Sequence, residues 1–273
     1  MKKIVSLLLA ILLLGSFALA DAASDAKLGL LKLMGVDGDI WTATINEHMK
    51  KFHDQDAVTM DNAIYYDSLT ELLSALDSDE VKAISTNNSI ARYITTRTDL
   101  YTMLENGGNS MGGYSMMVPG DAPETLALLN DAIAAMKADG TLNALQENYL
   151  YGDACNEVVQ IPAFEGAATI RVAITGDLPP VDHVDENGLP MGFSSALLAE
   201  IANRAQVNIE TVLVENTQRT DALSSGNADA LFWVRNVSCP VEGCDGYYMH
   251  EEAGDAVVTE SYFIDTLAAL IKK

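Results

Sequence analysis

The chain has 273 residues, of which 39 are acidic and 16 basic, so its formal net charge at pH 7 is −23. Nucleic acids and anionic membranes bind proteins largely through basic residues, so this charge argues against both as partners. The chain contains three cysteines and four histidines, and they show no metal-ligand spacing. Neither a metal nor another cofactor is expected.

Residues 1–20 are predicted to form a secretory signal peptide. Lys2 and Lys3 provide its charged start, an apolar run follows at 4–14, and small residues end the cleavage site at Ala20. The remaining 253 residues (273 − 20) carry 14 basic and 39 acidic residues, a net charge of −25. A periplasmic or extracellular location is therefore expected.

Export permits disulfide formation. Cys239 and Cys244 could close a small loop, which would leave Cys155 without a partner. The sequence leaves this pairing open.

Residues 26–152 are predicted to form a first α/β unit, because short apolar runs alternate with segments that have helical spacing. Gly140 suits a left-handed helix end, and Thr141 suits the start of the next helix. In chain order the predicted elements are a strand at 28–36, a helix at 40–52, a strand at 63–66, a helix at 68–76, a strand at 81–85, a helix at 90–95, a strand at 114–118, and helices at 124–138 and 142–149.

A polar, proline-containing stretch at 153–168 is predicted to be a linker, and residues 169–273 to form a second α/β unit. Asn187-Gly188 indicates a tight turn in this unit. Residues 75–84 and 222–231 both read as a helix end, a polar turn and a buried strand, which suggests that the two units share one plan. The predicted elements are strands at 170–174, 209–214, 230–234 and 266–271, and helices at 194–205 and 219–224.

Several motifs of the second unit occur in a characteristic order. A strand at 171–174 is followed by Pro179-Pro180, by the turn Asp185-Glu186-Asn187-Gly188, and by Gly192-Phe193 before a helix. Residues 223–230 then show the pattern Leu-x-Ser-Gly-x-x-Asp-Ala. This series resembles the extracellular solute-binding proteins of family 3, the amino-acid-type receptors of ABC importers. Further similar segments are 32–39, 66–68, 81–93, 132–149 and 259–263.

In that family the lobe similar to 169–273 comes first, whereas here it follows the lobe similar to 26–152. The resemblance therefore implies an α/β, two-lobed periplasmic-binding-protein-like fold of type II in circularly permuted order. Joining Lys273 to Leu28 would give one complete receptor. A fragment of a longer tandem array is the alternative.

The ligand is expected beyond the carboxyl ends of the strands, where open α/β sheets bind their ligands. The family resemblance implies three contacts, and this chain departs from each. Val181 stands where an aromatic residue would stack on the ligand, the Thr-x-x-Arg pattern that supplies a carboxylate partner is missing, and Asn87 replaces an ammonium-binding aspartate.

Other residues in the same loops can replace these contacts. Arg235 could supply the cation or be an ordinary surface arginine, and Trp233 could stack on a ligand or belong to the core. Asp177 could bind an ammonium group or cap its own loop. The candidate ligand-binding residues are Asp177, Trp233, Arg235, Asn236, Trp41, Thr42, Asn87 and Asn88.

The sequence thus favours an exported, monomeric binding protein that captures an amino-acid-like or amine solute between two lobes for an ABC permease. A degenerate binding-protein fold that serves as a sensory or protein-interaction module is the alternative. An enzyme is not expected, because the chain shows no nucleophile–base pair, phosphate loop or metal signature.

Overall fold

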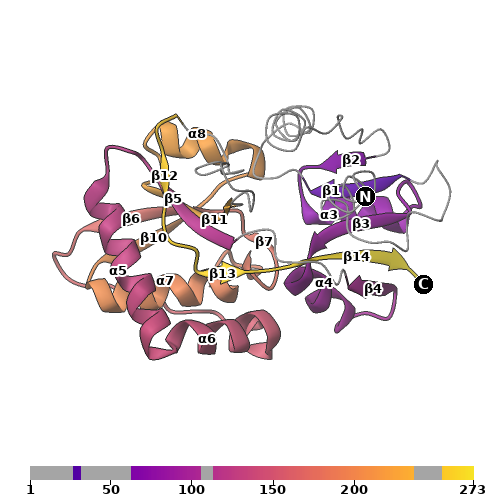
Figure 1. Ribbon diagram of the computed structural model, residues 1–273, viewed down its shortest axis with the longest axis horizontal. Helices are drawn as coiled ribbons and strands as arrows, with labels where there is room; N and C mark the ends of the chain where they lie inside the picture. The colour runs from indigo at the N-terminus through magenta and orange to yellow at the C-terminus, as the bar shows by residue number, and fades with distance from the viewer. Residues whose placement is uncertain (1–26, 32–62, 106–112, 237–253) are drawn as a thin grey trace, which may run out of the picture. The chain divides into compact units, whose positions relative to one another are not determined.

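The computed structural model describes residues 27–31, 63–105, 113–236 and 254–273, and they fall into two compact units (Figure 1). Unit 1 consists of residues 1–111, 237–248 and 265–273. Unit 2 consists of residues 112–236 and 249–264. Each unit is therefore built from segments that lie far apart in the sequence.

Unit 1 contains a five-stranded sheet with the order β2-β1-β3-β14-β4. The first three strands are parallel, whereas β14 runs antiparallel to both of its neighbours. The strands are β1 (Leu28–Leu31), β2 (Ala63–Tyr66), β3 (Ala83–Asn87), β4 (Tyr101–Glu105) and β14 (Leu267–Lys272), and the helices are α3 (Leu69–Asp77) and α4 (Asn88–Thr95).

The amphipathic helix α3 covers the parallel part of this sheet. Ser68 caps it by accepting a hydrogen bond from the Glu71 amide at 3.2 Å. Leu72 and Leu76 are fully buried, and Leu72 lies so close to β1 that a Cβ on Gly29 would come within 2.8 Å of it. Glycine in β1 thus allows the helix to approach the sheet.

Unit 2 contains a six-stranded sheet with the order β10-β6-β11-β5-β12, in which β13 also pairs with β5. Strands β10, β6 and β11 are parallel, and β5 is antiparallel to β11. The strands are β5 (Gly113–Val118), β6 (Thr169–Ile174), β10 (Asn208–Leu213), β11 (Ala230–Asn236), β12 (Val257–Val258) and β13 (Phe263–Ile264). A separate small sheet contains β7 (Asp177–Leu178), β8 (Asp182–Val184) and β9 (Pro190–Met191).

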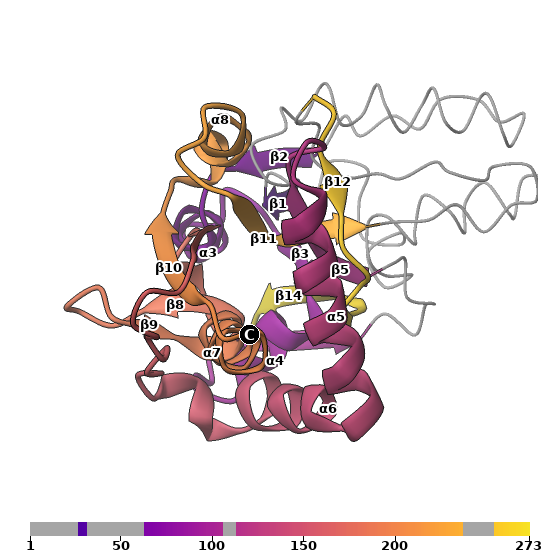
Figure 2. The same cartoon turned by 90° about the vertical axis from the view of Figure 1, so that its left-hand side faces the viewer.

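Four α-helices accompany this sheet in the described residues, and α5 and α6 both pack against α7 (Figure 2). Gly140 separates α5 from α6 with φ +83°, which confirms the predicted left-handed position. The helices are α5 (Pro123–Asp139), α6 (Thr141–Gln146), α7 (Gly192–Ala205) and α8 (Arg219–Ser224), with short turns of other helix types at Glu147–Tyr151, Asp153–Asn156 and Asn216–Gln218.

The two units share one plan, and the predicted α/β class with parallel layers is confirmed. In each unit three parallel strands are followed by an antiparallel strand from a remote part of the chain, namely β14 in unit 1 and β5 in unit 2. The division differs from the predicted units at 26–152 and 169–273, since residues 113–152 belong to unit 2 and 265–273 to unit 1. This exchange arises because β5 pairs with β11 and β14 pairs with β3.

The predicted linker at 153–168 packs onto unit 2. Cys155 is buried as a thiol whose Sγ donates to the Gly152 carbonyl at 3.4 Å. The amide of Phe164 donates to the Asn208 side chain at 2.7 Å, and Val158 forms a β-bridge with Met191. These contacts make the segment part of the unit 2 surface.

Several predictions fall outside the described residues. These are the signal peptide, the helix at 40–52, the end of the first strand beyond Leu31, and the Cys239–Cys244 loop. Within the described ranges, no helix combines the length and the apolar character needed to span a bilayer.

Candidate functional site

The loop that follows β6 carries Asp177, and the buried carboxylate of Asp182 holds this loop in place. Asp182 accepts hydrogen bonds from the Thr175 amide at 2.9 Å and from the Thr175 hydroxyl at 3.3 Å. Ser194, in the first turn of α7, donates to its other oxygen at 3.4 Å. Asp177 itself is half-buried, and it lies opposite His183 in the β7–β8 pair. The hydrogen bonds to Asp182 therefore fix the start of the loop, and Asp177 remains partly accessible to solvent.

Burial raises the pKa of Asp182 to about 6, although the Thr175 amide and the positive charge of Arg219 act in the opposite direction. The nearby Asp177 carboxylate raises this pKa further. A carboxyl group whose pKa is higher in the folded than in the unfolded state binds more protons when folded. Its contribution to stability is thus complete below pH 3.8 and is lost as the pH rises through about 6.

Asp182→Asn should remove this pH dependence. Between pH 5 and pH 8 the free energy of unfolding of the wild type, measured relative to that of the variant, should fall by about 1.4 kcal/mol, the energy of one pKa unit. Urea unfolding followed by circular dichroism at each pH measures the difference, and the range starts at pH 5 to stay above the sequence pI of about 4.2. A constant difference across this range would contradict the assignment.

The neighbouring strand β11 carries Trp233, Arg235 and Asn236 at its carboxyl end. Trp233 is only 5% exposed, and its ring stacks on that of Tyr114 with centroids 3.7 Å apart. This packing places Trp233 in the core of unit 2. Arg235 is half-buried, and Asn236 lies opposite Gly113 on β5. Because β6 and β11 are adjacent and parallel, their carboxyl ends bring the Asp177 loop and Arg235 to the same edge of the sheet.

In unit 1, Asn87 and Asn88 lie at the carboxyl end of β3 and the start of α4. The Asn87 side chain does not cap this helix but hydrogen-bonds Asp265. Asp265 takes the capping role instead, because its carboxylate accepts from the Ser89 amide at 3.1 Å and from the Ser89 hydroxyl at 2.6 Å. The amide of Asn88 donates to the Thr266 carbonyl at 2.8 Å. Burial nevertheless raises the pKa of Asp265.

The structure thus places Asp177 and Arg235 at the same edge of the unit 2 sheet, with Asn236 next to Arg235 on β11, and it places Asn87 and Asn88 at one loop of unit 1. Trp41 and Thr42 lie outside the described residues. Several polar residues behind these loops could not be predicted from the sequence, since a single polar residue gives no signal of its burial. Asp182, Ser194, Arg219 and Tyr262 are buried, and Asp265 is half-buried.

An open groove of about 840 Å³ lies along α8 and the carboxyl end of β10. Neither Asp177 nor Arg235 lines it. Asp221 is its one charged lining residue, and the remaining polar groups are neutral. The groove is therefore separate from the candidate ligand-binding residues.

Comparisons with solved structures give matches of low similarity. The zinc-bound ligand-binding component of an ABC-type import system from Staphylococcus aureus is 11% identical, with 89% of this chain and 65% of that chain covered and a TM-score of 0.41. The PBP AgaA of A. tumefaciens R10 in complex with agropinic acid is 11% identical, with 77% and 55% covered and a TM-score of 0.43. The chain thus spans less than two thirds of the length of each.

A phosphate-binding protein of a phosphate ABC transporter from Streptococcus pneumoniae is 10% identical, with 91% of this chain and 89% of that chain covered and a TM-score of 0.36. No curated protein matches the sequence. A family model matches residues 170–233, the stretch from β6 to Trp233 that contains Asp177, Asp182 and Arg219. Over these residues the chain matches the bacterial extracellular solute-binding proteins, family 3, which confirms the resemblance predicted from the motifs.

Proposed function

We propose that the chain is an exported solute-binding protein that delivers a small polar solute to an ABC-type importer. The observation that carries this proposal is the family match over residues 170–233, which includes the Asp177 loop and most of β11. Loops at the carboxyl ends of parallel strands are where open α/β sheets bind ligands. The protein acts as a binder and not as an enzyme, and its signal peptide is cleaved after Ala20.

The proposed solute is amino-acid-like or an amine. Asp177 supplies a carboxylate for an ammonium group, and Arg235 supplies a guanidinium that can grip a carboxylate through two hydrogen bonds. Asn87 and Asn88 offer amide groups in unit 1. Trp233 is too buried to stack broadly on a ligand, so its proposed role is to support the strand that carries Arg235.

We also propose that the lobes follow each other in circularly permuted order. Both sheets support this order, because β14 at the end of the chain inserts between β3 and β4, while β5 pairs with β11. Each unit thus receives its antiparallel strand from the segment that follows the other unit's strands.

A thermal-shift screen with amino acids, amines and small sugars tests the function, since a ligand stabilises the state that binds it. For a solute with a carboxylate, Arg235→Ala should weaken binding by about 10- to 100-fold, because a hydrogen bond to a charged group contributes about 1.5–3 kcal/mol. Isothermal titration calorimetry measures the loss. Arg171→Ala is the matched control. Arg171 lies on β6 and forms an ion pair with Asp229 at 2.7 Å, so its replacement should leave the affinity for the solute unchanged.

Unchanged affinity in Arg235→Ala would remove Arg235 from the site. Flat thermal shifts for every solute would favour the second candidate, a sensory or protein-interaction module that binds no transported ligand. The burial of Val181 and Trp233 favours this second candidate, because neither residue presents an open apolar face.

A further inference from the structure

Strand β11 contains a one-residue bulge at Phe232–Trp233, just ahead of Val234 and Arg235. Leu231 lies opposite Met117 and Val234 opposite Ser115, so two residues of β11 stand against Met116 alone. One of these two, Trp233, has φ +57°. A positive φ is costly for a bulky side chain and persists only where the surroundings enforce it.

The bulge decides which face of the sheet Arg235 occupies. Side chains alternate along a strand, so one extra residue moves every later side chain to the opposite face. With the bulge, Val234 is fully buried and Arg235 is half-buried. Without it, Val234 and Arg235 would exchange the faces of the sheet on which they lie.

Two buried polar side chains hold the backbone of the bulge. The Tyr262 hydroxyl accepts the Trp233 amide at 2.9 Å, and the Arg219 guanidinium donates to the Phe232 carbonyl. Tyr262 is 1% exposed and Arg219 is 2% exposed. The Tyr262 ring also stacks on Phe232 with centroids 5.1 Å apart. The strained backbone thus has its donor and its acceptor satisfied inside the core.

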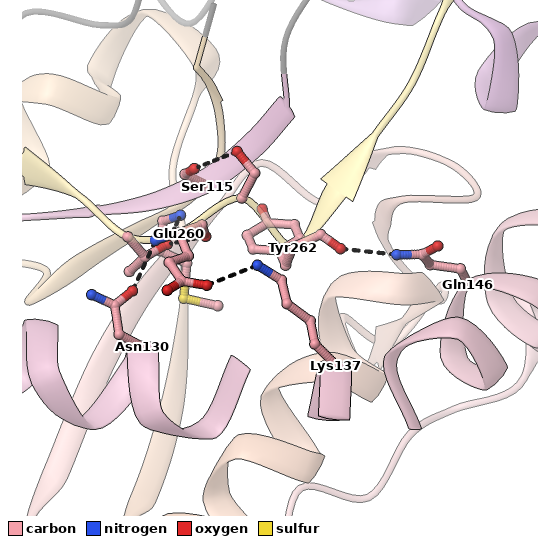
Figure 3. Close-up of polar contacts among 9 residues, drawn as sticks. Ser115, Asn130, Lys137, Gln146, Glu260 and Tyr262 are labelled. Carbon is pink, nitrogen blue, oxygen red and sulfur yellow. Dashed lines mark hydrogen bonds and ion pairs between the residues drawn. The ribbon is translucent and has the colours of Figure 1, made fainter. Parts of the chain in front are cut away.

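Tyr262 is anchored in turn by β5 and α6, and its neighbour Glu260 by α5 (Figure 3). The Tyr262 amide donates to the Tyr114 carbonyl at 2.8 Å, and its carbonyl accepts from the Gln146 side chain at 2.9 Å. Glu260 accepts from Lys137 at 2.9 Å, and its amide donates to Asn130 at 2.8 Å. The hydroxyl of Tyr262 is therefore presented to β11 in one defined place.

Arg219 also connects the bulge to the Asp177 loop. Its positive charge acts on the buried carboxylate of Asp182, which binds Thr175 at the start of that loop. Buried polar groups thus lie behind both candidate ligand-binding segments of unit 2, and the charge of Arg219 influences the carboxyl group of Asp182.

We propose that Tyr262 and Arg219 are positioning residues that maintain the bulge at Phe232–Trp233 and so set the face of the sheet from which Arg235 reaches the proposed solute. The link to a ligand rests on the proposed function, whereas the direction of Arg235 does not. Tyr262 is the better residue to test, because phenylalanine keeps the ring and removes only the hydroxyl.

The test compares Tyr262→Phe with the wild-type protein. Amide hydrogen exchange at Trp233 should become about 3- to 10-fold faster, in line with the loss of one hydrogen bond. Modification of Arg235 by phenylglyoxal, followed by mass spectrometry, should change about threefold or more in rate. Tyr101→Phe is the matched control, since this buried hydroxyl donates to Asp77 in unit 1, and neither rate should change.

Unchanged exchange at Trp233 would overturn the role of Tyr262 in holding the bulge. Faster exchange with unchanged Arg235 labelling would overturn its role in directing Arg235. If the wild type binds no amino acid or amine in the screen, the proposed function fails, while both rates still decide whether Tyr262 sets the direction of Arg235. If a carboxylate solute does bind, equal affinity in Tyr262→Phe would also overturn the proposal.

Discussion

Arg219→Ala is expected to lower the free energy of unfolding of unit 2 by about 1–3 kcal/mol, the cost of leaving a buried hydrogen-bonding group without its partner. The guanidinium is 2% exposed, donates to the Phe232 carbonyl and offsets the charge of Asp182. Its removal leaves the buried Phe232 carbonyl without this donor and takes a positive charge away from the buried Asp182 carboxylate, which keeps its hydrogen bonds from Thr175 and Ser194. In the Trp41→Phe background, urea unfolding followed by Trp233 fluorescence reports on unit 2 alone.

Arg171→Ala provides the control for this loss. Arg171 forms an ion pair with Asp229 at 2.7 Å, but both side chains are more than a third exposed, so water and salt screen the pair. Its replacement should therefore cost far less stability. Equal losses in the two variants would show that burial does not set the contribution of Arg219.

Phe193→Ala is the second variant expected to have a large effect, with a loss of about 3–5 kcal/mol for a fully buried phenylalanine. Phe193 follows Gly192 at the start of α7 and is completely buried. Its ring lies 6.1 Å from that of Tyr262 and 6.0 Å from that of Phe263, measured between centroids. The variant should thus loosen the attachment of the 259–264 segment to unit 2.

Hydrogen exchange of residues 259–264 and urea unfolding together measure this effect. Leu213→Ala serves as the comparison, because Leu213 is 51% exposed at the end of β10 and should cost no more than about 0.5 kcal/mol. A stable Phe193→Ala variant with slow exchange in 259–264 would contradict the packing described above.

Local sequence patterns predicted most of the described helices. The segment Leu69–Asp77 has an apolar stripe and a serine cap, and both act within a few residues of each other. The same holds for the turn at Asp185–Leu189, where Asp185 accepts amides from Asn187 and Leu189. The strands β7, β8, β9, β12 and β13 were not predicted, because two or three residues give too little periodicity, and the five-residue strand β4 was not predicted either.

The candidate site could be predicted only in outline. The motifs identified the loops after β6 and β11, and the family match covers nearly all of β6 and β11 as far as Trp233. The burial of Trp233 and the role of Asp182 could not be predicted, because whether a side chain is enclosed depends on elements that pack around it from elsewhere. A tryptophan in the core and a tryptophan that stacks on a ligand can have identical neighbours in the sequence, so the local sequence does not distinguish them.

By itself, the amino-acid sequence determined the alternation of strands and helices, the left-handed position of Gly140, and the motifs shared with a family of binding proteins. Each of these depends on interactions within a few residues. The tertiary structure alone decided that β14 joins unit 1, that β5 joins β11, and that Asp265 caps a helix 176 residues away in the sequence. Strand pairing and the contacts of buried polar groups depend on segments that are distant in the sequence. The hydrophobic periodicity of a segment predicts that it forms a strand, but it does not predict which strand pairs with it.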